Sequence, residues 1–90
     1  MFDKVIAITD RKICERPFLS QIEIVCKHHP KALVLREKDM MEEDYYLLAM
    51  DVYEICDKYG VRLIIHNFPQ AAGRLYSLKQ NSQSVYNLIL

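Results

Sequence analysis

Three short apolar runs recur along this 90-residue chain at nearly equal intervals. They begin at residues 5, 32 and 61, which gives intervals of 27 and 29 residues. The runs are Val5–Ile8, Ala32–Leu35 and Val61–Ile65. Each interval holds one strand, one helix and two loops. Because the runs are continuous rather than alternating, we predict buried strands of a parallel sheet with both faces covered by helices.

The segments between the runs have helical periodicity. From Tyr45 to Tyr59 apolar side chains recur three or four residues apart and line one stripe. Asp39 followed by Glu42 predicts a capping box, and Gly60 stands where a left-handed residue ends a helix. A shorter helix is predicted before the second run, with an apolar stripe that comprises Phe18, Ile22, Val25 and Cys26.

After the third run the pattern weakens. Residues 69–75 predict a short third helix, with Asn67 as its cap. For residues 85–90 a strand, a helix and a frayed end all remain open. We therefore predict a βαβαβα unit over residues 1–75, followed by a divergent tail over residues 76–90.

Composition narrows the class of protein. Apolar residues make up 51% of the chain and charged residues 27%, which is typical of a globular domain. The formal net charge is zero, so no overall field favours nucleic acid or anionic lipid as a partner. No apolar run is long enough to span a membrane, and no signal-peptide pattern is present. We expect a cytoplasmic protein.

The three cysteines, Cys14, Cys26 and Cys56, show no paired spacing. Cys26 and Cys56 fall on the apolar faces of the predicted helices, where small buried hydrophobic residues are expected. Cys26 lies near His28 and His29, but no second pair of ligands follows, so we expect neither a disulfide framework nor a metal site.

Polar residues follow each predicted strand, and in a parallel sheet these strand ends meet on one rim. After the second strand, Arg36 and Lys38 are two residues apart, so on extended backbone they point to one side and Glu37 to the other. Two converging cations suit a phosphate or pyrophosphate, because arginine offers a planar fork and lysine a point charge. The alternative is that both are solvated loop charges, or partners of Asp10 and Asp39.

The other two strand ends carry Thr9 and Asp10, and His66 and Asn67. All four are candidates for binding a substrate. The alternatives are a loop cap for Asp10, a surface position for His66 and a helix cap for Asn67. With Gly60 and Gly73 as its only glycines, the chain has no glycine-rich phosphate loop, which argues against dinucleotide or P-loop binding.

Taken together, three motifs resemble the family of thiamine phosphate synthase and its TenI-like relative, thiazole tautomerase. They are Ile8-Thr9-Asp10-Arg11, Leu35-Arg36-Glu37-Lys38 and Leu63-Ile64-Ile65-His66-Asn67, each at a strand end and in the family's order. The resemblance implies a (β/α)8 TIM barrel. It also implies thiamine biosynthesis: the synthase, a transferase, joins a pyrimidine pyrophosphate to a thiazole phosphate with the help of magnesium, whereas the tautomerase isomerises a thiazole carboxylate phosphate without a metal.

By the same resemblance, Arg36 and Lys38 match the family's cationic pair that holds the pyrophosphate. The chain has Val34 where the synthase has a glutamine, and Asn67 where it has the aspartate that binds magnesium. A neutral amide is a poorer ligand than a carboxylate for a hard dication. These two departures favour the tautomerase branch, and the resemblance alone identifies no catalytic residue in this chain.

A complete barrel takes about 250 residues, or about 200 at the short end. Ninety residues supply about three βα units, so we expect part of a barrel that is truncated and not catalytic alone. A partial barrel leaves an open sheet edge, which favours self-association into a homo-oligomer. The alternative function is a small α/β assembly or regulatory module that uses this edge.

Overall fold

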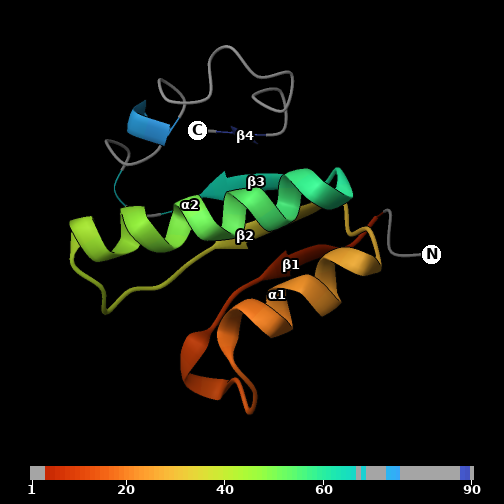
Figure 1. Ribbon diagram of the computed structural model, residues 1–90, viewed down its shortest axis with the longest axis horizontal. Coiled ribbons are helices and arrows are strands. Elements are labelled where there is room, and N and C mark those ends of the chain that lie inside the picture. The colour runs from red at the N-terminus through yellow and green to blue at the C-terminus, as the bar shows by residue number, and fades with distance from the viewer. Residues whose placement is uncertain (1–3, 67, 69–72, 76–87, 90) are drawn as a thin grey trace.

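Four parallel strands form one sheet, in which neighbouring strands follow the order of the chain (Figure 1). The computed structural model describes residues 4–66, 68, 73–75 and 88–89. The strands are β1 (Ile6–Ile8), β2 (Ala32–Leu35), β3 (Arg62–Ile65) and β4 (Leu88–Ile89). Each strand pairs in parallel with the next. The chain is therefore an α/β protein, and the βαβαβ order predicted from the apolar runs is confirmed.

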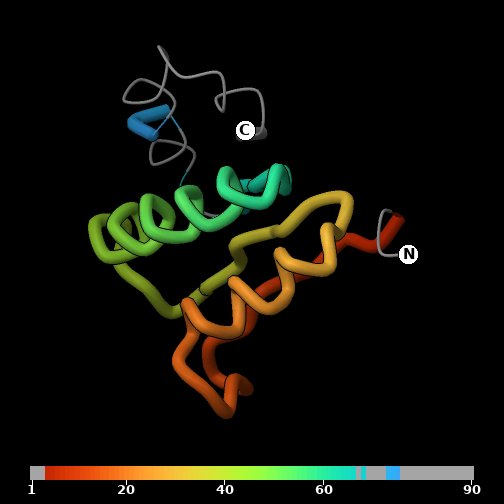
Figure 2. The backbone as a smooth tube through the Cα atoms, turned by 45° about the vertical axis from the view of Figure 1, so that its right-hand side comes forward, coloured from red at the N-terminus to blue at the C-terminus, as the bar shows by residue number. Residues whose placement is uncertain are grey.

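Helices connect the first three strands. A short 3-10 helix, η1 (Arg11–Ile13), follows β1 and leads to α1 (Phe18–Lys27), and α2 (Glu42–Tyr59) connects β2 to β3. The two α-helices pack side by side (Figure 2), and α2 also contacts β3. The buried core comprises Ile22, Cys26, Leu33, Leu35, Tyr45, Tyr46, Ala49, Val52, Tyr53, Cys56, Val61, Leu63, Ile65 and Leu75.

One face of the sheet packs against the helices, whereas side chains of β1 on the other face are exposed. Leu33, Leu35 and Leu63 point toward the helices and are no more than 1% exposed. On the opposite face, Ile6 is 50% exposed and Ile8 is 60% exposed. The prediction that both faces are covered is therefore wrong at β1, because no described segment packs over these two isoleucines.

The ends of α2 confirm one predicted signal and contradict another. Gly60 ends the helix with φ of 68°, a left-handed conformation that glycine adopts without steric cost. At the other end the N-cap residue is Met41, which makes no side-chain capping bond. The predicted Asp39–Glu42 capping box is therefore wrong, and the Asp39 carboxylate binds Arg11 instead.

The C-terminal part is described only at a few positions. Of the alternatives for residues 85–90, a strand forms at Leu88–Ile89, beside β3. Asn67, most of the predicted helix over 69–75, and residues 76–87 lie outside the described residues, so the tail prediction is not tested.

Within the described ranges, no helix combines the length and the apolar character that crossing a membrane requires. The cytoplasmic location stays a prediction.

Cys26 and Cys56 lie buried where α1 meets α2, with their Sγ atoms 3.9 Å apart. The contact with Cys26, together with burial, raises the pKa of the Cys56 thiol above its ordinary value. Both residues therefore pack as small hydrophobic side chains, as the helical stripes predicted.

We expect a thiol reagent to modify only Cys14 in the folded protein, because Cys26 and Cys56 are 0% and 1% exposed whereas Cys14 is partly exposed. Mass spectrometry after labelling should show one adduct in native buffer and all three in denaturant. Modification of Cys26 in native buffer at the rate of Cys14 would contradict the packing of the two helices.

Candidate functional site

The ends of β1 and β2 enclose a small polar cavity on the rim of the sheet. Its volume is about 260 Å³. The lining residues are Thr9, Asp10, Lys12, Arg36, Glu37, Lys38 and Asp39. Four of these, Thr9, Asp10, Arg36 and Lys38, are the candidates that the sequence placed at the ends of the first two strands. The parallel register brings them together, since Ile8 pairs with Val34 one residue before Thr9 and two before Arg36.

The third strand end contributes less to this cavity. His66 follows β3, its side chain is exposed, and it does not line the cavity. Asn67 lies outside the described residues, so its candidate role is not tested.

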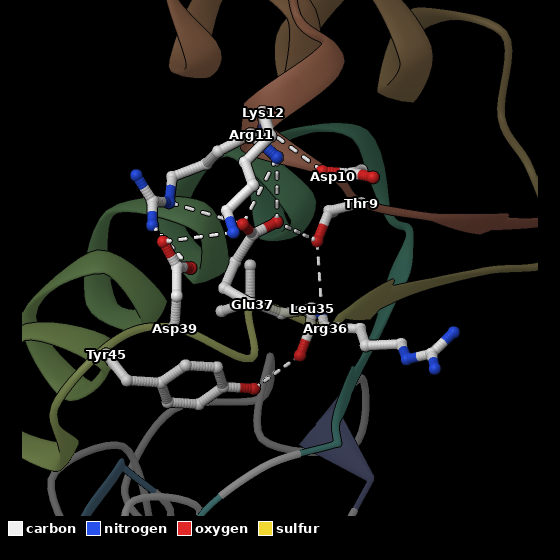
Figure 3. Close-up of polar contacts among 9 residues, drawn as sticks. All are labelled: Thr9, Asp10, Arg11, Lys12, Leu35, Arg36, Glu37, Asp39 and Tyr45. Atoms are coloured by element: carbon white, nitrogen blue, oxygen red, sulfur yellow. Dashed lines mark hydrogen bonds and ion pairs between the residues drawn. The ribbon is translucent and has the colours of Figure 1, made fainter.

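Side-chain exposure alternates along residues 36–38, directly after β2, as the sequence predicted. Arg36 and Lys38 are exposed, whereas Glu37 between them is 3% exposed. The buried carboxylate accepts a hydrogen bond from Thr9 Oγ1 at 2.8 Å and from the backbone N–H of Arg11 at 3.1 Å (Figure 3). The Nε atom of Arg11 lies 3.2 Å from the same carboxylate. A buried carboxylate needs such partners, because burial of an unpaired charge is strongly unfavourable.

Asp39 holds the other side of Arg11. Its carboxylate accepts a hydrogen bond from Arg11 Nη2 at 2.9 Å, and Lys12 Nζ lies 3.8 Å from its second oxygen. Desolvation raises the pKa of Asp39, but a backbone hydrogen bond and the charges of Arg11 and Lys12 outweigh it and lower the pKa below its usual value. Arg11 is therefore shared by Glu37 and Asp39, and its charge is neutralised.

The Thr9 hydroxyl joins the two strand ends. The O–H group donates to Glu37, and its oxygen accepts a hydrogen bond from the backbone N–H of Arg36 at 3.0 Å. This second bond fixes the backbone of Arg36. In Figure 3 the Arg36 side chain points away from the cluster of Arg11, Glu37 and Asp39.

Arg36 and Lys38 have no acidic partner in the described part of the chain. No ion pair joins either side chain to any residue that the structure describes. The alternative in which they pair with Asp10 and Asp39 is therefore wrong, because Asp39 binds Arg11 and Lys12. Asp10 caps η1 by accepting a hydrogen bond from the Lys12 N–H at 3.0 Å, which confirms the loop-cap interpretation.

Arg11 and Lys12 were not singled out from the sequence, although both support the rim. The sequence does contain a signal for Arg11. Arg11 closely follows β1, and Glu37 is the residue of the segment after β2 whose side chain points to the buried side. In a parallel sheet these two positions are neighbours on the rim, and a buried carboxylate there requires a cation.

The described part of this rim offers few free oxygen ligands for a magnesium ion. Glu37, Asp39 and Asp10 already accept hydrogen bonds from protein donors. Among residues 4–66, 68, 73–75 and 88–89, no cluster of three or more histidine, cysteine or carboxylate side chains is arranged to hold a metal ion. A hard dication prefers several converging oxygen ligands, and these carboxylates are engaged elsewhere.

Comparison with known proteins gives a consistent result. Residues 5–77 match the family model described as thiamine monophosphate synthase. A thiamine-phosphate synthase of Fusobacterium nucleatum is 38% identical over 65 residues, which cover 71% of this chain and 32% of that protein. A putative thiamine-phosphate synthase 2 of Aquifex aeolicus is 36% identical over 63 residues, which cover 70% of this chain and 34% of that protein.

A third relative, a thiamine-phosphate synthase of Caldanaerobacter subterraneus, is 37% identical over 62 residues, which cover 68% of this chain and 29% of that protein. This chain thus spans about a third of the length of the curated relatives it matches. No solved structure shows a significant match. Since the family model covers most of the sequence, the chain belongs to the thiamine monophosphate synthase family.

Proposed function

We propose that this chain acts in thiamine biosynthesis and that its rim cavity binds the phosphate or pyrophosphate group of a phosphorylated pyrimidine or thiazole. One observation carries the proposal: Arg36 and Lys38 line the same cavity of about 260 Å³, and neither is paired with a described acidic side chain. The family's named activity supplies the class of substrate.

The arrangement of charges favours an anion over a cation as the ligand. Three acidic side chains line the cavity, but Glu37 and Asp39 are held by Arg11, and Asp10 caps η1. Arg36 offers two parallel N–H donors to a phosphate, and Lys38 adds a compact charge. Lys12 lies on the same cavity and brings a third cation close to the anion.

We further propose that the rim is half of a barrel mouth and that these ninety residues bind the anion without turning it over. The three carboxylates that line the described cavity each accept a structural hydrogen bond, and Glu37 and Asp39 are also paired with Arg11, which favours a structural role for these two side chains. Val34 and Asn67, where the synthase has a glutamine and an aspartate, favour the metal-independent tautomerase branch for this site.

Calorimetric titration with pyrophosphate tests the proposal. We expect the wild-type chain to bind it, and the double variant Arg36→Ala/Lys38→Ala to bind about 100-fold more weakly, because each charge-assisted contact contributes about 1.5 kcal/mol. The matched control is Lys31→Ala/Arg62→Ala, which removes two exposed cations outside the cavity and should leave the affinity within about twofold. Absence of binding by the wild type, or equal binding by the double variant, would refute the site.

A second candidate function is assembly through the sheet. The exposed Ile6 and Ile8 on β1 favour it, since a pair of half-exposed isoleucines on a strand is a surface suited to another chain.

A further inference from the structure

β2 ends at Leu35, and the peptide unit that follows it is held by two side chains. The polar groups of this unit are the C=O of Leu35 and the N–H of Arg36. The hydroxyl of Tyr45 donates a hydrogen bond to the C=O at 2.5 Å, and the hydroxyl of Thr9 accepts one from the N–H at 3.0 Å (Figure 3). The backbone is therefore fixed directly before the arginine that lines the rim cavity.

The two hydrogen bonds act on opposite edges of one plane. A trans peptide unit is planar, and its C=O and N–H point in opposite directions. Thr9 reaches the unit from the end of β1, and Tyr45 reaches it from near the start of α2. Together the two bonds oppose rotation of the plane about the axis that joins its two Cα atoms. Such a rotation changes φ of Arg36, which sets the direction in which its side chain leaves the backbone.

The next residue restrains Arg36 from its other side. Glu37 is 3% exposed, and its carboxylate accepts a hydrogen bond from the same Thr9 hydroxyl at 2.8 Å. Because successive side chains on extended backbone point to opposite sides, a buried Glu37 directs Arg36 outward. Thr9 therefore holds both the peptide unit before Arg36 and the side chain after it.

Tyr45 is separated from any ligand of the rim cavity. Its side chain is 0% exposed and does not line the cavity. Its ring packs against Phe68, with the ring centres 5.4 Å apart. An effect of the Tyr45 hydroxyl on a bound anion is therefore indirect, and the hydrogen bond to Leu35 provides the path.

We propose that Thr9 and Tyr45 are positioning residues of the phosphate site, because their hydrogen bonds hold the backbone of Arg36 in the conformation that presents its guanidinium to the anion. A backbone that is ordered before binding has less conformational entropy to lose when the ligand binds. Tyr45 thus contributes to the affinity without touching the ligand. The inference rests on the proposed function, since it requires that Arg36 binds the anion.

Calorimetric titration of Tyr45→Phe with pyrophosphate tests the buried hydroxyl. Phenylalanine keeps the ring and removes the hydrogen bond to Leu35, so we expect binding to be about fivefold weaker while circular dichroism stays native. The matched control is Tyr53→Phe, which removes a hydroxyl from another buried tyrosine of α2 and should leave the affinity within about twofold. Equal affinities of Tyr45→Phe and the wild type would overturn the inference.

A double-mutant cycle tests whether Tyr45 acts through Arg36. In an Arg36→Ala background Lys38 still attracts the anion, and adding Tyr45→Phe should change the affinity by less than about twofold, because the side chain that it positions is gone. A fivefold loss that persists in this background would show that the substitution loosens the rim as a whole, and would overturn the inference.

Amide hydrogen exchange followed by NMR tests the hold on the peptide unit without a ligand. We expect the Arg36 N–H to exchange about fivefold faster in Tyr45→Phe and in Thr9→Val than in the wild type, and Thr9→Ser, which keeps the hydroxyl, to restore the slow rate. Neither site is a sequence neighbour of Arg36, so its intrinsic exchange rate is unchanged. Wild-type exchange rates in both Tyr45→Phe and Thr9→Val would overturn the inference.

The two proposals fail in different ways. If the wild type does not bind pyrophosphate, the phosphate site is refuted, and the positioning role of the two hydroxyls with it. If the wild type binds and Tyr45→Phe binds equally well, the positioning role alone is refuted and the phosphate site stands.

Discussion

Replacing Glu37 with glutamine should lower the free energy of unfolding by about 2 kcal/mol. Glu37 accepts hydrogen bonds from Thr9 and from the backbone of Arg11, and faces the Arg11 guanidinium. Glutamine keeps the shape but removes the charge, and its amide group replaces an acceptor with a donor. Because the Arg11 side chain is 34% exposed, solvent screens part of the loss, and we expect less than for a fully buried pair.

Urea denaturation monitored by circular dichroism measures this change. The matched control is Glu15→Gln, which removes the same charge from an exposed side chain and should change stability by less than about 0.5 kcal/mol. Equal denaturation midpoints for Glu37→Gln and the wild type would show that the rim does not depend on this carboxylate.

Leu63→Ala should be more harmful, with a loss of about 3 kcal/mol. Leu63 is 0% exposed and lies on β3, between β2 and β4, on the face that packs against the helices. Truncation removes apolar contacts and leaves a cavity that the packed core fills only in part.

The neighbouring residue provides the control for this variant. Ile64 lies on the opposite face of the same strand and is only partly buried, so Ile64→Ala should cost about 1 kcal/mol in the same denaturation experiment. Similar losses for the two variants would mean that both faces of β3 are covered, contrary to the exposure seen at Ile6 and Ile8 on β1.

Local patterns predicted most of the fold. The run at Ala32–Leu35 matches β2 without change, and Gly60 ends α2 in the expected conformation. The errors have a common cause: both concern features that depend on which distant parts of the chain pack nearby. The apolar run at β1 implies burial on both faces, but no described segment packs over Ile6 and Ile8 on the face opposite the helices. Asp39 has the spacing of a helix cap, but Arg11, 28 residues away in the sequence, binds it in the folded protein.

The sequence also predicted part of the candidate site. Strand polarity alone placed Thr9, Asp10, Arg36 and Lys38 on one rim, and the parallel sheet brings them around one cavity. The roles of Arg11 and Lys12 depend on carboxylates at another strand end, so they emerge only when the ends of β1 and β2 are considered together. Which cations remain unpaired is decided by those long-range contacts.

The Thr9 hydroxyl has a consequence for how this rim can recognise a ligand. A hydroxyl has a single proton to donate, and Thr9 gives that proton to Glu37 while its oxygen receives the N–H of Arg36. The hydroxyl therefore has no proton left for a bound anion, although it lines the cavity. In the proposed phosphate site, the directional donors for the oxygens of the anion therefore come from Arg36 and Lys38 rather than from Thr9, and we expect binding to weaken as added salt screens these cations.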